Sequence, residues 1–221
     1  MSATFPERLV RPTVLLFDWD NTLVDGWTGI AAALNAAFDA FGKPRWTVED
    51  TKQRVRVSLK ESFPAMFGDA WERARDIFYD TFRGDHLDHV TPMPGAAEAL
   101  LAAAAWPLGV VSNKAGDYLR AEVAHLGWSA YFRAVIGAGD ADADKPDPAP
   151  ILLALRQLGF SAGKQVWYLG DTALDMKAAR AAGVTAVLVG DAAHDGGVEL
   201  ASPDLHVHSA HELEAWLKTL A

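Results

Sequence analysis

Seven side chains suited to acid, base, phosphate or metal chemistry follow short apolar runs of this 221-residue sequence, where buried strands are expected to end. They are Asp18, Asp20, Ser112, Asn113, Lys145, Asp171 and Asp175. In an open parallel sheet, ligands bind just beyond the carboxyl ends of the strands. We therefore expect these side chains, which come from four separate strand ends, to converge at one edge of a sheet.

The spacing of the carboxylates points to a metal ion. Asp18 and Asp20 are two residues apart at a strand end, so both reach one cavity if the chain turns between them. Asp171 and Asp175 are four residues apart at the start of a predicted helix, which places them on one face. Carboxylates this close cannot all ionise without a cation, and an oxygen-only ligand set favours Mg²⁺. The sequence thus predicts a divalent cation site, to which Lys145 adds positive charge.

The elements that must position these residues follow a βα rhythm from about residue 93 to the end of the chain. Strands are expected at residues 13–17, 107–111, 133–137, 165–170 and 185–190, with a weak edge strand at 205–208. Helices are expected at residues 94–105, 115–126, 147–159, 172–182 and 210–219. This pattern predicts an α/β fold whose core is a Rossmann-like, doubly wound parallel sheet.

Residues 26–90 break this rhythm, and none of the segment looks like a strand. The stretch "WTGIAAALNAAFDAFG" reads as an amphipathic helix ended by Gly42 and Pro44, and Thr47 with Asp50 has the pattern of a capping box. An insertion of roughly sixty residues is far longer than an ordinary connection. We therefore predict a helical cap domain at 26–90, inserted into a catalytic core made of 1–25 and 91–221.

Charge and composition narrow the possible partners. Lys and Arg number 20 against 29 Asp and Glu, a formal charge of −9 that argues against a broad nucleic-acid surface and a polybasic membrane anchor. There is no cysteine, which excludes disulfides and thiolate chemistry. The first residues show no secretory signal, and the Ala-rich stretch 99–111 is too short to span a bilayer. We expect a cytoplasmic monomer or homodimer that acts on a small phosphorylated metabolite and binds neither nucleic acid nor membrane.

Four segments resemble the signature motifs of the haloacid dehalogenase-like hydrolase superfamily and occur in that family's order. They are "DWDNTLVD", "VVSNK", "DKPDPAPILLALRQLG" and "YLGDTALD". A helical insertion directly after the first motif is similar to the phosphoglycolate phosphatase branch. The resemblance covers the core from residue 13 to about 190 and implies hydrolysis of a phosphate ester.

The resemblance also assigns roles to the convergent residues. Asp18 would be the nucleophile that forms an aspartyl-phosphate, and Asp20 would protonate the leaving alcohol and then deprotonate the attacking water. The Ser112 hydroxyl and the Asn113 backbone N–H would hold phosphate oxygens. Lys145 would neutralise charge on the transferring group.

The cofactor implied is Mg²⁺. Asp18 and Asp171 would bind it directly, Asp20 only through its backbone carbonyl, and Asp175 through water. Two neighbouring carboxylates with opposite tasks need different pKa values, and metal ligation of the Asp18 side chain alone would separate them. Asn21 stands where the family often has Gly, but Asn tolerates a left-handed backbone, so the turn after Asp20 is expected to form.

Several functions remain open within this framework. The first expectation is an Mg²⁺-dependent phosphatase for a small phosphate monoester, with 2-phosphoglycolate as first candidate. Sugar phosphomutase and phosphonatase relatives use basic residues of the cap, and residues 27–41 contain no Lys, Arg or His. A non-catalytic phosphate-binding relative would be expected to lack Asp18 or Asp20. A receiver-type signalling domain would place its phosphorylated Asp after the third strand and carry no helical insertion.

Other polar residues have simpler interpretations. Lys114 is predicted to be a surface charge at the start of a helix. The "LHVH" segment at 205–208 is read as an exposed edge strand, not as a metal site. Arg54, Arg56 and Lys60 either grip an anionic substrate or form a solvated helix face.

Overall fold

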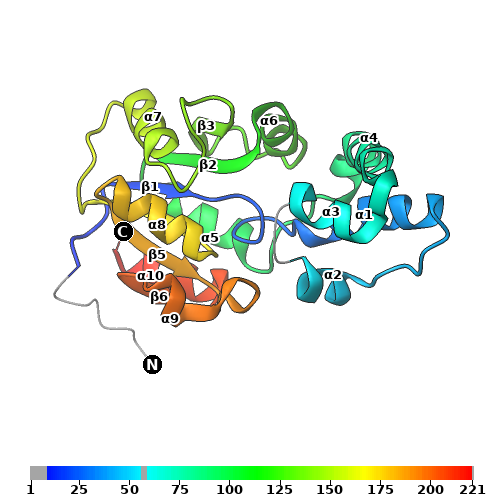
Figure 1. Ribbon diagram of the computed structural model, residues 1–221. Helices are drawn as coiled ribbons and strands as arrows, with labels where there is room; N and C mark the ends of the chain where they lie inside the picture. Colours follow the sequence, from blue (N-terminus) through cyan, green and yellow to red (C-terminus); the bar gives the residue numbers. More distant parts are fainter. Residues whose placement is uncertain (1–8, 56–58, 221) are drawn as a thin grey trace. The chain divides into compact units, whose positions relative to one another are not determined.

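The computed structural model describes residues 9–55 and 59–220, and the side chains of all of these except 59–61 (Figure 1). The chain forms two compact units. One consists of Met1–Val24 with Pro92–Ala221, and the other is Asp25–Thr91. We call them the sheet unit and the helical unit.

The sheet unit is built on a parallel sheet with the strand order β3-β2-β1-β4-β5-β6. Its strands are β1 (Val14–Phe17), β2 (Leu108–Ala115), β3 (Phe132–Ala138), β4 (Val166–Gly170), β5 (Thr185–Val189) and β6 (Leu205–Val207). The chain runs outward from β1 to β3 and then restarts beside β1 at β4. The point at which the strand order reverses therefore lies between β1 and β4, which is where open α/β sheets bind ligands.

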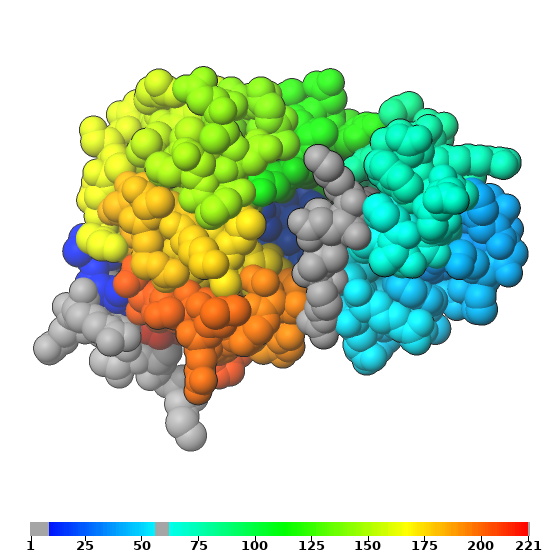
Figure 2. Space-filling model, in the orientation of Figure 1, coloured from blue at the N-terminus to red at the C-terminus, as the bar shows by residue number. Residues whose placement is uncertain are grey.

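Helices cover both faces of this sheet. They are α5 (Ala96–Ala103), α6 (Gly116–His125), α7 (Ala149–Leu158), α8 (Ala173–Ala181), α9 (Gly197–Ala201) and α10 (Ala210–Leu220). On one face, α7 and α8 pack on Val14 and Leu16 of β1 in a single apolar cluster. Figure 2 shows the unit from the side of α8 and α9. The alternate residues Leu15 and Phe17 are fully buried as well, so β1 is apolar along its whole length because neither face meets water.

The predicted α/β, doubly wound architecture is confirmed, and most strand ends agree with the prediction to within one or two residues. The exception is β2, which continues past the predicted end at residue 111 to Ala115. The predicted strand ends at residue 111 because the run of apolar residues ends there. The strand goes on because Ala115 still pairs with Ala138 of β3, after a register shift.

The helical unit contains α1 (Trp27–Ala40), α2 (Val48–Arg54), α3 (Leu59–Phe67), the 3-10 turn η1 (Gly68–Ala70) and α4 (Trp71–His89). Its own apolar cluster includes Leu34, Phe38, Phe63 and Phe78, so it has a core separate from that of the sheet unit. The predicted capping box is present at the start of α2, where Thr47 and Asp50 bond to each other's backbone N–H.

Candidate active site

The reversal point of the sheet brings three of the predicted aspartates together. Asp18 directly follows β1 and is tied to β4 by its N–H, which donates to the Leu169 carbonyl at 2.7 Å. Asp171 directly follows β4, and Asp175 lies in the first turn of α8. Each of the three buried carboxylates offers one oxygen within 4.8 Å of the others. The convergence expected from the strand ends is therefore present for Asp18, Asp171 and Asp175.

Lys145 lies at the centre of this cluster. Its Nζ donates to Asp18 Oδ1 at 2.6 Å, to Asp175 Oδ1 at 2.7 Å and to the Tyr168 hydroxyl at 2.9 Å, and its side chain is 3% exposed. The Asn113 side chain fixes the lysine backbone from both sides, because its Oδ1 accepts from Lys145 N and its Nδ2 donates to Lys145 O. Asn113 thus joins the end of β2 to the loop that carries the lysine.

Burial dominates the protonation behaviour of the cluster. It raises the pKa of Asp18 well above its ordinary value, although the Lys145 ammonium opposes this. Burial also raises the pKa of Asp171, with a partial opposing effect from His194. Burial alone would lower the pKa of Lys145, but Asp175 and Asp18 raise it well above its ordinary range. Three buried carboxylates around one ammonium group leave the site in need of further positive charge.

The carboxylates differ in how many of their oxygens are already engaged. Asp175 Oδ1 accepts from Lys145, and its Oδ2 accepts from both the N–H and the hydroxyl of Thr172 in a capping box that starts α8. Asp171 Oδ2 is buried and makes no hydrogen bond within the described part of the chain; it has an ion-pair contact with His194 Nε2 at 3.3 Å. This oxygen-only donor set fits a hard divalent cation, with Asp18 and Asp171 better placed than Asp175 for direct contact.

Asp20 lies in a different environment from Asp18. Its side chain is 29% exposed, and its Oδ1 accepts from Lys114 Nζ at 2.8 Å. Burial raises its pKa, and the Lys114 ammonium opposes the shift. The turn beyond it passes through Asn21 at φ 63°, the left-handed conformation expected from the sequence. Asp18 and Asp20 of the first motif are thus paired with two different lysines.

The prediction for Lys114 was wrong. Its side chain is only 8% exposed, although it stands two residues before α6, because its Nζ lies against Asp20 instead of in solvent. Its Nζ also donates to Glu122 Oε2 at 2.6 Å. The sequence did contain a signal, since Glu122 shares a face of α6 with the buried Leu119 and Val123. A charged residue on a buried face needs a partner.

Further residues of the site escaped the sequence reasoning. The Thr22 hydroxyl donates to Asp171 Oδ1 at 3.2 Å, and the buried Tyr168 hydroxyl donates to the Val111 carbonyl at 2.8 Å. A Cβ at Gly170 would lie 2.4 Å from Asp175 Cγ, so only glycine lets that carboxylate approach the strand end.

Ser112 is buried at the end of the apolar part of β2, where its hydroxyl accepts from the Lys114 N–H at 3.2 Å. The phosphate-binding roles of Ser112 and the Asn113 N–H stay predictions. In the helical unit, the Arg54 guanidinium lies 4.9 Å from the centre of the Trp46 ring. Arg56 and the side chain of Lys60 lie outside the described residues.

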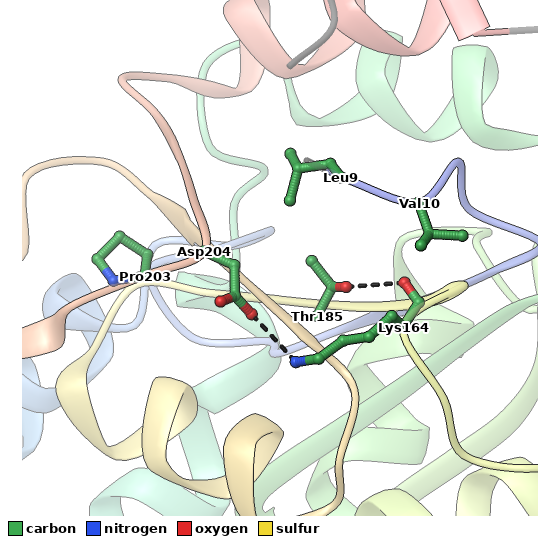
Figure 3. A pocket seen from close by; sticks show the side chains of 6 residues that line it. All are labelled: Leu9, Val10, Lys164, Thr185, Pro203 and Asp204. Atoms are coloured by element: carbon green, nitrogen blue, oxygen red, sulfur yellow. Dashed lines mark hydrogen bonds and ion pairs between the residues drawn. The ribbon is translucent and has the colours of Figure 1, made fainter. Parts of the chain in front are cut away.

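A hollow of about 260 Å³ lies near the amino ends of the strands, lined by Leu9, Val10, Lys164, Thr185, Pro203 and Asp204 (Figure 3). Its polar groups already have partners. Lys164 Nζ lies 3.5 Å from Asp204 Oδ2, and the Thr185 hydroxyl donates to the Lys164 carbonyl at 2.7 Å. The groups with unusual charge environments are therefore at the other edge of the sheet, around Asp18.

Comparison with known proteins shows which family the whole chain resembles. The model of the family described as haloacid dehalogenase-like hydrolase matches residues 15–189. A phosphoglycolate phosphatase of Chromobacterium violaceum is 32% identical over 213 residues, which cover 91% of this chain and 95% of that protein. A phosphoglycolate phosphatase of Escherichia coli O157:H7 is 30% identical over 225 residues, covering 89% of each. A haloacid dehalogenase-like family hydrolase of Streptococcus pneumoniae, with 22% identity, superposes with a TM-score of 0.79 over 93% of this chain and 98% of that one.

The chain belongs to the haloacid dehalogenase-like hydrolase family. Within that family it is similar to phosphoglycolate phosphatases along most of its length, so the resemblance predicted from the four motifs is confirmed. The prediction that it is a hydrolase of the phosphatase type is confirmed with it. Over the ranges that the structure describes, no helix is both long and apolar enough to cross a bilayer.

Proposed function

We propose that the protein is an Mg²⁺-dependent phosphatase that hydrolyses a small phosphate monoester, with 2-phosphoglycolate as the first candidate, through an aspartyl-phosphate on Asp18. One observation carries the proposal. Two carboxylates of one short motif have different partners, Lys145 for Asp18 and Lys114 for Asp20. Neighbouring carboxylates in different environments can take opposite tasks, one as nucleophile and one as acid and base.

In the first step, an Asp18 oxygen attacks the phosphorus as the bond from phosphorus to the leaving alcohol breaks. Asp20 gives its proton to that alcohol oxygen. Lys145, which contacts Asp18 directly, offsets the negative charge of the transferring group. The Ser112 hydroxyl and the Asn113 N–H hold phosphate oxygens.

In the second step, the carboxylate of Asp20 takes a proton from water, whose oxygen attacks the phosphorus of the aspartyl-phosphate. The bond between phosphorus and Asp18 breaks, which releases inorganic phosphate and restores both aspartates to their starting charge. A single residue therefore serves as acid and then as base.

The proposed metal site consists of the Asp18 and Asp171 carboxylates and the Asp20 backbone carbonyl, with Asp175 contributing through water. A bound Mg²⁺ would neutralise phosphate charge and orient the ester for in-line attack. The buried Asp171 carboxylate supports this assignment, because the contact of its Oδ2 with His194 does not prevent burial from raising the pKa of the group, and a bound cation would favour its charged form.

We further propose that residues 26–90 act as a cap that selects the leaving group, on a catalytic core of 1–25 and 91–221. A cytoplasmic location, a monomeric or homodimeric state and the absence of nucleic-acid partners belong to the same proposal, supported by the charge of −9. Mutase or phosphonatase chemistry is less well supported, since α1 carries no Lys, Arg or His. A binding-only role is less well supported because Asp18 and Asp20 are both present.

The test is phosphate release from a panel of small phosphate monoesters that includes 2-phosphoglycolate, with Mg²⁺ and with chelator. The variant Asp18→Asn keeps the shape of the site and removes the nucleophile. We expect release that requires Mg²⁺ and disappears in the variant. A folded wild-type protein that releases phosphate from no panel member would overturn the proposal.

A further inference from the structure

A continuous chain of polar contacts connects the sheet unit's interior to Asp20. The Trp19 indole N–H donates to Glu122 Oε2 at 2.6 Å, Lys114 Nζ donates to the same oxygen at 2.6 Å, and Lys114 Nζ also donates to Asp20 Oδ1 at 2.8 Å. Glu122 is 1% exposed and Trp19 fully buried. This series of hydrogen bonds therefore joins β2, α6 and the turn after β1 through well-packed side chains.

This geometry limits where the Asp20 carboxylate can lie. The Lys114 ammonium is held by Glu122 of α6, and Glu122 is held in turn by the ring of Trp19. Because Glu122 holds the Lys114 ammonium in place, the hydrogen bond from that ammonium favours one position of Asp20 Oδ1. The ammonium of a solvent-exposed lysine would instead move together with the carboxylate. Charge-assisted bonds of this length are strong and directional.

The two lysines of the site are not interchangeable. The Nζ of Lys145 donates hydrogen bonds to Asp18, Asp175 and Tyr168. The Nζ of Lys114 donates hydrogen bonds to Asp20 and Glu122. The acid/base group of the proposed reaction thus has its own support, independent of the support of the nucleophile.

We propose that Lys114, anchored by Glu122, is a positioning residue that holds the Asp20 carboxylate where it can exchange a proton with the leaving alcohol and with water. The inference rests on the proposed function, in which Asp20 is the acid and base. The alternative is that the pair of Lys114 and Glu122 only holds β2 against α6 and does not position Asp20. The two differ in what happens to substrates whose leaving group needs no proton.

The experiment uses single turnovers with enzyme in excess, quenched in acid, with 2-phosphoglycolate and with p-nitrophenyl phosphate. The first releases a strongly basic alkoxide and needs an acid; the second releases a weakly basic phenolate and does not. The main variant is Lys114→Met with Glu122→Gln, which leaves no unpaired charge at position 122 and keeps an acceptor for Trp19. Lys114→Gln, whose amide can donate to the same carboxylates, is the second variant. Lys164→Met removes a different ion pair of the same unit and is the control.

Mispositioning of a catalytic group by about 1 Å costs on the order of 10²-fold in rate. We therefore expect phosphorylation of Asp18 by 2-phosphoglycolate to slow by about that factor in both Lys114 variants, and phosphorylation by p-nitrophenyl phosphate to slow far less. Decay of the phosphoenzyme should slow equally after either substrate. The enzyme concentration that gives half of the maximal single-turnover rate should not change, and Lys164→Met should behave as wild type.

Equal slowing of phosphorylation by the two substrates, or no slowing, in folded Lys114 variants would overturn the positioning role and leave the proposed function intact. A wild-type protein that forms no phosphoenzyme with either substrate would overturn both. A larger slowing of phosphorylation with the alkyl ester than with the aryl ester is the result that a purely structural role of Lys114 cannot produce.

Discussion

Replacing Lys145 with Met should lower the free energy of unfolding by about 3–5 kcal/mol in the absence of metal. The Lys145 side chain is 3% exposed, and its ammonium contacts Asp18 at 2.6 Å and Asp175 at 2.7 Å, so its removal leaves two neighbouring buried carboxylates without their shared cation. Methionine has nearly the same length as lysine, so packing changes little. The size of the loss follows from uncompensated buried charge.

Urea unfolding in the presence of chelator, followed by circular dichroism, measures this loss. The matched control is Lys164→Met, because Lys164 is 56% exposed and pairs with Asp204 at 3.5 Å; a loss below about 1 kcal/mol is expected there. Adding Asp175→Asn to Lys145→Met should recover part of the stability, because one uncompensated carboxylate disappears. A Lys145→Met protein as stable as the Lys164→Met protein would refute the reasoning.

Three other changes test separate parts of the structure. Asp171→Asn should weaken Mg²⁺ binding by about tenfold or more, as seen by calorimetric titration of the metal alone; unchanged affinity would remove this residue from the metal site. Gly170→Ala should destabilise the protein by about 1–3 kcal/mol in urea, because the new Cβ meets Asp175 Cγ at 2.4 Å, and a neutral result would contradict that close approach. Burial alone would raise the pKa of Asp140, but the hydrogen bonds from Arg120 and the Gly137 N–H more than offset this, so the pKa of Asp140 lies below its ordinary value. The ionised Asp140 therefore stabilises the fold above the pKa that it has in the unfolded chain, and this stabilisation is lost as the pH falls. The difference in free energy of unfolding between wild type and Arg120→Met should shrink below about pH 4. A difference that stays constant with pH would argue against the ion pair.

The fold was predictable because the strands are buried on both faces. Residues Val14–Phe17 and Thr185–Val189 form nearly continuous apolar runs, which is what a parallel sheet covered by helices requires. The end of β2 was not predictable, since Ser112, Asn113 and Lys114 are polar and yet remain in the strand. They lie between Val111 and Ala115, which pair with Ile136 and Ala138 of β3, some twenty residues further along the chain.

The same distinction separates the predicted from the missed parts of the site. Asp18, Asp171 and Asp175 follow strand ends, and strand ends of one sheet meet at one edge. The pairing of Lys114 with Asp20 and Glu122 follows no local spacing, because it depends on how α6 packs beside β2. Sequence periodicity gives the face on which a residue lies but not the partner that it meets across the core.

The most direct test of the account is whether Asp18 becomes phosphorylated during turnover. Wild-type protein with Mg²⁺ is mixed with 2-phosphoglycolate, or with the best ester of the panel, quenched in acid within one turnover, digested and analysed by mass spectrometry. We predict a phosphate group on the peptide that contains Asp18, and none in Asp18→Asn or with chelator. Rapid release of inorganic phosphate with no phosphorylated peptide, or with phosphate on another residue, would contradict the central claim.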